Sequence, residues 1–157
     1  MTHLLALDPG GTTGYSLWTY DSLTPLTLLE HGQIPGGLLG FSLWAREYRS
    51  AHWIDQVVSE DFVDDDRTDS PEVVSLRIEG AIVALLQIEG ASVVWQRNTA
   101  KAAADDLFLK RHGFWFKGQE HARDSARHAI HYMKARRHMP TIERFWPRRS
   151  REAAMAS

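Results

Sequence analysis

The sequence contains no cysteine among its 157 residues. A disulfide framework, a thiol nucleophile and a cysteine-ligated zinc or iron–sulfur site are therefore excluded, and the missing disulfides are typical of a cytoplasmic protein. Apolar runs are also short, because none approaches the roughly 18 residues of a membrane-spanning helix. The first residues, MTHLLALDPGG, lack the basic segment of a signal peptide. We expect one cytoplasmic domain without membrane association, since a domain usually takes roughly 100–200 residues.

Positive charge is scarce in the first half of the chain. Residues 1–79 contain 4 Lys or Arg and 13 Asp or Glu, whereas residues 80–157 contain 14 and 7. This asymmetry favours a polyanionic partner for the second half and carboxylates in the first half that bind a cation or face water. An alternative is that the two halves neutralise each other on the folded surface.

The hydrophobic pattern predicts strands first and then alternating helices and strands. Strands are expected at 3–9, 15–20, 26–34, 57–63 and 91–95. Helices are expected at 38–56, 71–87, 99–113 and 119–138, with Pro140 ending the last one. This order predicts an α/β fold, a mixed five-stranded sheet with helices on both faces. The domain is expected to span 1–140, and 141–157 to form a basic, partly disordered tail.

Asp8 is the first candidate site residue. It ends the first predicted strand, in LALDPGGTTGY, where the glycines that follow leave space for a phosphate or ligand to approach the backbone. An Asp before Pro-Gly also begins many turns, so a purely structural role is an equal alternative.

Glu60 is the second candidate, in the apolar strand VVSEDFV. An acid is costly to bury there without a partner, and the adjacent Asp61 points to the opposite face. Either Glu60 serves a site at the open end of the strand, or the pair marks a frayed end that enters the acidic segment 64–72.

The last predicted helix carries the third candidate. His121, Asp124 and His128 are spaced by three and four residues and share one face. The apolar stripe faces roughly the opposite way, which favours a solvated face; Asp124 reaches Asp8 and Glu60 only if the first turn overhangs the sheet edge. A zinc site made of the histidines at 121, 128 and 131 is disfavoured by poor spacing and the lack of cysteine.

Together, in this order, the motifs resemble those of RuvC-type Holliday junction resolvases of the ribonuclease-H-like nuclease superfamily, in a phage or bacterial form. LALDPGGTTGY resembles the first-strand motif with its Asp, and VVSEDF resembles the strand with a metal-binding Glu. HARDSARHAI resembles the last-helix motif, in which a His or acid precedes an acid by three residues. VVWQRNTAKAA lies where the family has a lysine, which Lys101 matches.

The resemblance implies a Mg²⁺-dependent endonuclease, with Mn²⁺ possible and two ions per site, that nicks four-way DNA junctions. Asp8 is expected as the shared metal ligand, with Glu60 and Asp124 completing the two coordination shells. His121 is expected to ligate or to orient the attacking water, and Lys101 to contact the scissile phosphate. His121 stands where many members have an acid, and either Glu60 or Asp61 can be the ligand.

Branched DNA is the expected partner, contacted through its phosphates. The residues expected to bind it are Lys101, Lys110, Arg111, Lys117, Arg148 and Arg149. A four-way junction has two-fold symmetry, which favours a homodimer. The interface is expected on the small-residue face of the helix at 71–87, unless that face packs only on its own sheet; its residues are Leu76, Gly80, Val83 and Ala84.

Three other functions compete with junction cleavage. A nuclease of the same fold can cut flaps or forks, because these motifs do not specify the DNA shape. A non-catalytic branched-DNA-binding protein is disfavoured because all three acids are present. The DPGGTTG segment also resembles the phosphate loop of sugar kinases, which need two related domains where this chain provides one.

Overall fold

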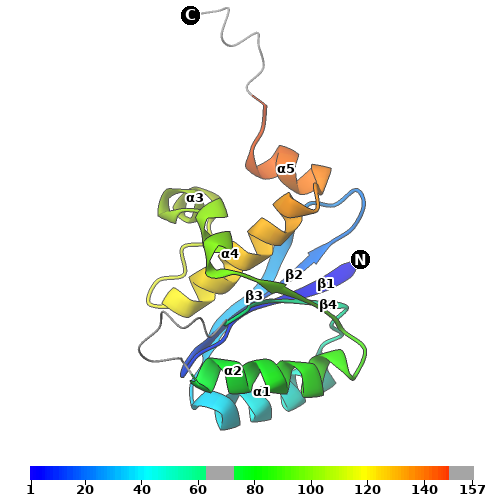
Figure 1. Ribbon diagram of the computed structural model, residues 1–157. Helices are drawn as coiled ribbons and strands as arrows, with labels where there is room; N and C mark the ends of the chain where they lie inside the picture. The colour runs from blue at the N-terminus through cyan, green and yellow to red at the C-terminus, as the bar shows by residue number, and fades with distance from the viewer. Residues whose placement is uncertain (63–72, 149–157) are drawn as a thin grey trace, which may run out of the picture.

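The computed structural model describes residues 1–62 and 73–148. Within them, one mixed sheet has the strand order β3-β2-β1-β4-β5 and is covered by helices on both faces (Figure 1). The strands are β1 (Thr2–Asp8), β2 (Thr13–Tyr20), β3 (Thr27–Ile34), β4 (Gln56–Glu60) and β5 (Ser92–Gln96). The predicted α/β class and five-stranded mixed sheet are confirmed. None of the helices in this part of the chain is long and apolar enough to span a membrane.

The central strand β1 separates two hydrophobic cores. It pairs antiparallel with β2 and parallel with β4. Leu4 and Ala6 pack into one core, whereas Leu5 and Leu7 pack into the other, because successive side chains of a strand point to opposite faces. By the same alternation, Asp8 points to the side of Leu4 and Ala6.

Two helical layers enclose the sheet (Figure 1). On one face lie α1 (Gly37–Ala51) and α2 (Val73–Ile82), which continues into a π-helical turn, η1 (Val83–Gln87). On the other lie α3 (Asp106–His112), α4 (Glu120–Ala135) and α5 (Met139–Phe145). Helix α4 packs directly on β1 and β2, so the even-numbered residues of β1 face it.

Two predicted helices have different limits. The helix expected at 99–113 is divided into a 3₁₀ helix, η2 (Asn98–Ala103), and α3. Asp105 caps α3, because its carboxylate accepts a hydrogen bond from the backbone N–H of Phe108 at 2.8 Å. The helix expected at 38–56 ends at Ala51, where the next residue is extended.

The predicted boundary after residue 140 is also wrong. A left-handed residue, Arg137 (φ 56°), follows the end of α4. Pro140 lies in the first turn of α5 rather than ending α4, a position that suits its fixed φ. Phe145 is buried in the core beneath α3 and α4, so residues 141–145 belong to the packed domain. The last part of the predicted tail, 149–157, lies outside the described residues.

Candidate metal centre

Three strand ends meet below the first turns of α4. Asp8 ends β1 and Glu60 ends the neighbouring parallel strand β4, and each is only 5% exposed. Glu60 lies opposite Gln96, which ends β5. Val58 packs into the core on the α4 side, so alternation along β4 points Glu60 to that side as well. The carboxyl ends of adjacent parallel strands thus bring two buried acids together, the position where open α/β sheets commonly bind ligands.

Gly14 lets α4 approach this edge. It lies opposite Asp8 in the sheet, and a Cβ at this position would be 1.9 Å from the backbone oxygen of His121. Only glycine permits such an approach. The backbone N–H of His121 also donates to Oε1 of Gln33 on β3 at 2.9 Å. These contacts hold the start of α4 over the ends of the strands.

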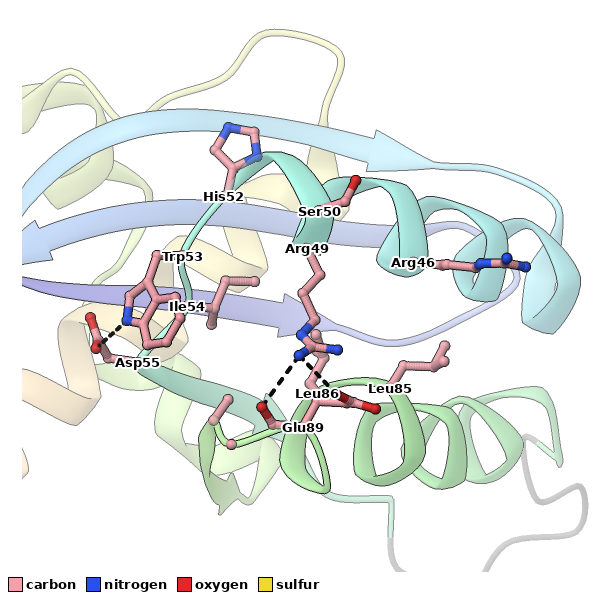
Figure 2. Close-up of a pocket in the computed structure, with 12 residues that line it drawn as sticks. Arg46, Arg49, Ser50, His52, Trp53, Ile54, Asp55, Leu85, Leu86 and Glu89 are labelled. Atoms are coloured by element: carbon pink, nitrogen blue, oxygen red, sulfur yellow. Dashed lines mark hydrogen bonds and ion pairs between the residues drawn. The ribbon is translucent and has the colours of Figure 1, made fainter.

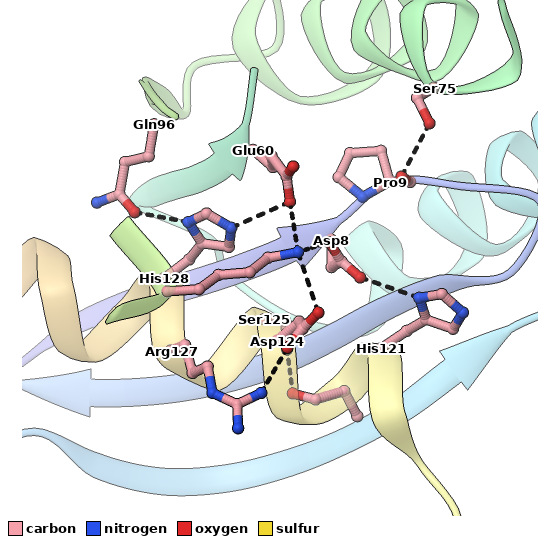
Figure 3. A network of polar contacts seen from close by, with 12 residues as sticks. Asp8, Pro9, Glu60, Ser75, Gln96, His121, Asp124, Ser125, Arg127 and His128 are labelled. Carbon is pink, nitrogen blue, oxygen red and sulfur yellow. Dashed lines mark hydrogen bonds and ion pairs between the residues drawn. The ribbon is translucent and has the colours of Figure 1, made fainter. Parts of the chain in front are cut away.

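One ammonium group joins three carboxylates at the centre of the cluster (Figure 3). Nζ of Lys101, on η2, lies 3.1 Å from Oδ1 of Asp8, 2.8 Å from Oε2 of Glu60 and 3.0 Å from Oδ2 of Asp124. Three carboxylates this close repel one another unless a cation lies among them. Lys101 provides that positive charge in the structure.

The acids differ in how readily they ionise. Burial raises the pKa of Asp8 to about 6, against the attraction of Lys101. Burial also opposes ionisation of Glu60, but hydrogen bonds with His128 and Lys101 outweigh it and lower the pKa of Glu60 to about 2. Burial likewise disfavours the charged form of Lys101, yet the attraction of Asp8 and the hydrogen bonds to Glu60 and Asp124 raise its pKa. The ammonium is therefore charged.

The two predicted residues of α4 also reach the cluster. Nδ1 of His121 is 3.0 Å from Oδ2 of Asp8, and its side chain is 45% exposed. Asp124 contacts Lys101 on one side and accepts a hydrogen bond from Nη1 of Arg127 at 2.5 Å on the other. The solvated-face alternative for Asp124 is therefore wrong, because the first turn of α4 overlies the strand ends. All five residues expected to be catalytic thus lie together, and their roles stay predictions.

His128 is a further member of the cluster, which the sequence interpretation placed on the shared face of the last helix but did not count among the site residues. It is fully buried, and it offers a ligand atom that lies within 4.8 Å of ligand atoms of Asp8 and Glu60. The spacing of His128 from His121 and Asp124 indicated that the three share one face of the helix. The apolar stripe predicted a different buried face. In the structure the buried face of α4 also includes Ser125, whose hydroxyl donates to Ser16 on β2 at 2.9 Å.

Gln96 and Arg127 also support the cluster, and no feature of the sequence predicted that they would. Gln96 accepts a hydrogen bond from Nδ1 of His128 at 2.8 Å. Arg127 donates to Asp106 and to the backbone oxygen of Ala104 as well as to Asp124. It therefore ties α4 to the start of α3 and fixes the Asp124 carboxylate.

The donor set fits a divalent cation. Carboxylate oxygens are the ligands that Mg²⁺ and other hard cations prefer, and the space among Asp8, Glu60 and Asp124 already accommodates the ammonium of Lys101. Asp61 follows the end of β4, and its backbone N–H donates to the carbonyl of Gln96 at 2.7 Å. Among the described residues, the tight group of potential ligands contains Glu60 rather than Asp61.

Exposed basic residues lie on the same side of the sheet. Lys110 and Arg111 belong to the last turn of α3, Lys117 to the loop before α4, and Arg148 follows α5. The indole of Trp115 contacts two cations, Nζ of Lys110 at 4.5 Å and the guanidinium of Arg123 at 3.9 Å from the ring centre. Arg149 lies outside the described residues.

A separate hollow of about 600 Å³ lies at the other end of the parallel strands. Its lining includes Ile54 and Ala91, which come just before β4 and β5. Figure 2 shows the ion pair between Arg49 and Glu89 beside it, with an N–O distance of 2.9 Å. The carboxylate cluster is at the opposite ends of these strands, so the hollow is not part of it.

No protein-family model and no curated protein matches this chain. Several solved structures do. RuvC of Thermus thermophilus in complex with a Holliday junction substrate is 14% identical, with a TM-score of 0.68 over 89% of this chain and 98% of that one. The fowlpox virus Holliday junction resolvase is 16% identical, with a TM-score of 0.62 over 85% and 99%.

The yeast mitochondrial Holliday junction resolvase also has a similar structure, with 11% identity and a TM-score of 0.58 over 92% of this chain and 84% of that one. Identities this low establish a likeness of fold. This likeness of fold agrees with the strand order and the two helical layers. It also agrees with the near-complete coverage of the bacterial and viral chains. This protein has the fold of the RuvC-type Holliday junction resolvases.

Proposed function

We propose that this protein is a metal-dependent endonuclease that nicks four-way DNA junctions during recombination, repair or phage DNA processing. The observation that carries the proposal is the convergence of Asp8, Glu60 and Asp124 on one cation, Lys101 Nζ, at distances of 2.8–3.1 Å. The fold supports it, because the similar bacterial, viral and yeast structures are Holliday junction resolvases.

Phosphodiester hydrolysis joins a water oxygen to phosphorus and releases the 3′ oxygen. Two divalent ions per site, Mg²⁺ or alternatively Mn²⁺, would supply an activated water and offset the charge on the phosphate. Asp8, Glu60 and Asp124 would hold them. The half-exposed His121 beside Asp8 ligates or orients the attacking water. With a metal ion held by the carboxylates, Lys101 would be free to contact the scissile phosphate.

A four-way junction has two-fold symmetry and is cut at two symmetric positions, so the protein is expected to act as a homodimer. The helix expected to form its interface turns Ile78 and Ile82 toward the core, whereas Leu76, Gly80 and Ala84 are exposed. The alternative that this face packs only on its own sheet is therefore disfavoured. Exposed basic residues on the side of the cluster, including Lys110, Lys117 and Arg148, would contact DNA phosphates.

The test is a cleavage assay with end-labelled DNA and Mg²⁺ or Mn²⁺. The substrates are a mobile four-way junction, a fork, a 5′ flap and a plain duplex. We expect paired symmetric nicks on the junction from the wild-type protein, and none from Asp8→Asn, which should still bind DNA. Glu60→Gln should be inactive as well, whereas the matched variant Asp61→Asn should cut.

The other outcomes identify the competing functions. Cutting mainly at flaps or forks would retain the fold and the metal site but replace junction cleavage. Absence of metal-dependent cutting on every substrate, with junction binding intact, would show a branched-DNA-binding protein. Loss of both cutting and binding in Asp8→Asn would indicate that Asp8 is needed for folding.

A further inference from the structure

His128 has an unusual environment for a buried histidine. Its side chain is 0% exposed, on the face of α4 that covers the ends of β4 and β5. Both ring nitrogens point to polar groups (Figure 3): Nδ1 lies 2.8 Å from Oε1 of Gln96, and Nε2 lies 3.4 Å from Oε2 of Glu60. A histidine that only filled space would be surrounded by apolar side chains.

The contact with Gln96 determines which nitrogen carries the proton. Oε1 of an amide side chain can only accept, so Nδ1 of His128 must donate to it. In the neutral ring, Nε2 then presents a lone pair toward the carboxylate of Glu60, another acceptor. Two buried acceptors facing each other are unfavourable unless a cation or a proton lies between them. A proton on Nε2 turns the 3.4 Å contact into a hydrogen bond to Glu60, and a metal ion in place of that proton would bind both atoms at once.

We propose that Nε2 of His128 is a metal ligand, oriented by Gln96, in the cluster with Asp8 and Glu60. This inference rests on the proposed function and adds a ligand to its site. The ligand atoms of these three residues lie within 4.8 Å of one another, so they can share one ion. A metal-binding histidine usually donates its other ring N–H to an oxygen acceptor, which fixes its tautomer, and the Nδ1–H contact to Gln96 matches this pattern.

A nitrogen ligand has consequences for the choice of metal. Imidazole binds transition-metal ions well, whereas Mg²⁺ prefers oxygen. Loss of the imidazole should therefore weaken binding of Mn²⁺ or Co²⁺ more than binding of Mg²⁺. The site should prefer Mn²⁺ to Mg²⁺ in the wild-type protein for the same reason.

The first measurement is the dissociation constant of each metal for the full-length protein without DNA. We expect His128→Ala to raise the Kd for Mn²⁺ on the order of 10–100-fold, the range that supporting groups of metal sites already reach, and the Kd for Mg²⁺ by less. Gln96→Ala should shift both in the same direction, less strongly. His131→Ala is the matched control on α4 and should leave both constants unchanged. His128→Gln, which keeps a polar side chain without an imidazole, should behave like His128→Ala and replaces it if that variant does not fold.

The second measurement is pulsed electron paramagnetic resonance of bound Mn²⁺, which detects directly coordinated nitrogen. We expect nitrogen coupling in the wild type that persists in His121→Ala and disappears in His121→Ala/His128→Ala. Unchanged coupling and unchanged Mn²⁺ affinity on loss of His128 would overturn the inference and make His128 a protonated partner of Glu60. Junction cleavage by the wild type would survive that result. A wild-type protein that binds no metal would overturn this inference together with the proposed metal dependence.

Discussion

Lys101 Nζ lies 2.8 Å from Oε2 of Glu60, and the pKa of that Glu60 carboxyl is lowered to about 2. The same ammonium contacts Asp8 and Asp124, and the lysine side chain is 22% exposed. It therefore occupies the position among the carboxylates that suits a metal ion, and it balances their charge in the absence of one. This arrangement makes the stability of the cluster depend on which cation is present.

The first prediction concerns removal of that charge. Lys101→Met keeps the volume of the side chain but removes the ammonium that Asp8, Glu60 and Asp124 share, and among the described residues only Asp124 keeps another cation, Arg127. We expect the free energy of unfolding of the metal-free protein to fall by about 3 kcal/mol, within the range for removing one partner of a buried ion pair. Mg²⁺ should stabilise this variant more than it stabilises the wild type, as measured by thermal unfolding with and without the metal. Lys110→Met is the exposed control. An unchanged melting temperature and an unchanged response to Mg²⁺ would contradict the prediction.

The second prediction concerns pH. Asp8 has its pKa raised from 3.8 to about 6, chiefly by burial. Below pH 6 the metal-free protein therefore holds a proton on Asp8 that a metal ion must displace. Metal affinity should fall by up to about tenfold for each pH unit below 6, and it should level off above 6 because no proton is then released by this group.

Isothermal titration with Mg²⁺ between pH 5 and pH 8 measures this slope. His121→Gln is the control, because it removes the neighbouring imidazole but keeps Asp8, and the slope should persist in it. A Mg²⁺ affinity that is constant from pH 5 to pH 7 would show that Asp8 is already ionised in the metal-free protein.

Alternation along strands made much of the site predictable. Asp8 ends an apolar segment, and that position indicates an edge of a sheet. Glu60 lies within the strand expected at 57–63, whereas the structure ends β4 at Glu60. The strand pairing that brings them together, with β1 parallel to β4, is a finding of the structure. The five-stranded sheet follows from the same pattern, because residues such as Leu4 and Leu5 must be buried on opposite faces.

The helices were less predictable, because tertiary packing decides which face they bury. The apolar residues of α4 indicate one stripe, yet His128 and Ser125 are fully buried beside it. Polar residues can be buried there because Gln96, Glu60 and Ser16 on the sheet pair with them. Those partners are 32 to 109 residues away in the chain, and neither periodicity nor propensity contains that information.

A third prediction concerns the close approach of β2 and α4. Gly14→Ala places a methyl group 1.9 Å from the backbone oxygen of His121, so α4 must move. We expect destabilisation on the order of 3 kcal/mol, typical of a strong overpacking effect, and a loss of metal affinity because His121 and Asp124 shift with the helix. Denaturant unfolding and metal titration measure the two effects. Gly11→Ala is the matched control, since a Cβ there meets nothing within 4 Å. Equal stability of the two variants would mean that β2 and α4 are not in contact at Gly14.

The last prediction concerns the charged surface on the side of the cluster. Each lysine or arginine that contacts a phosphate adds about one to the slope of log affinity against log salt concentration. Lys117 and Arg148 are exposed beside α4 and after α5, so Lys117→Ala and Arg148→Ala should each lower the slope of junction binding by about one. Lys110→Ala should do the same and also remove a cation from the ring of Trp115.

Arg49 provides the control for this prediction. It is exposed at the far end of the parallel strands, where it pairs with Glu89 at 2.9 Å. Arg49→Ala removes the same charge from α1, on the other face of the sheet, and it should leave the salt dependence unchanged. If Arg49→Ala lowers the slope as much as Lys117→Ala, binding follows the net charge of the protein. A decrease confined to Lys110, Lys117 and Arg148 would place the DNA on the face of the sheet that α3, α4 and α5 cover, the face toward which Asp8 and Glu60 point.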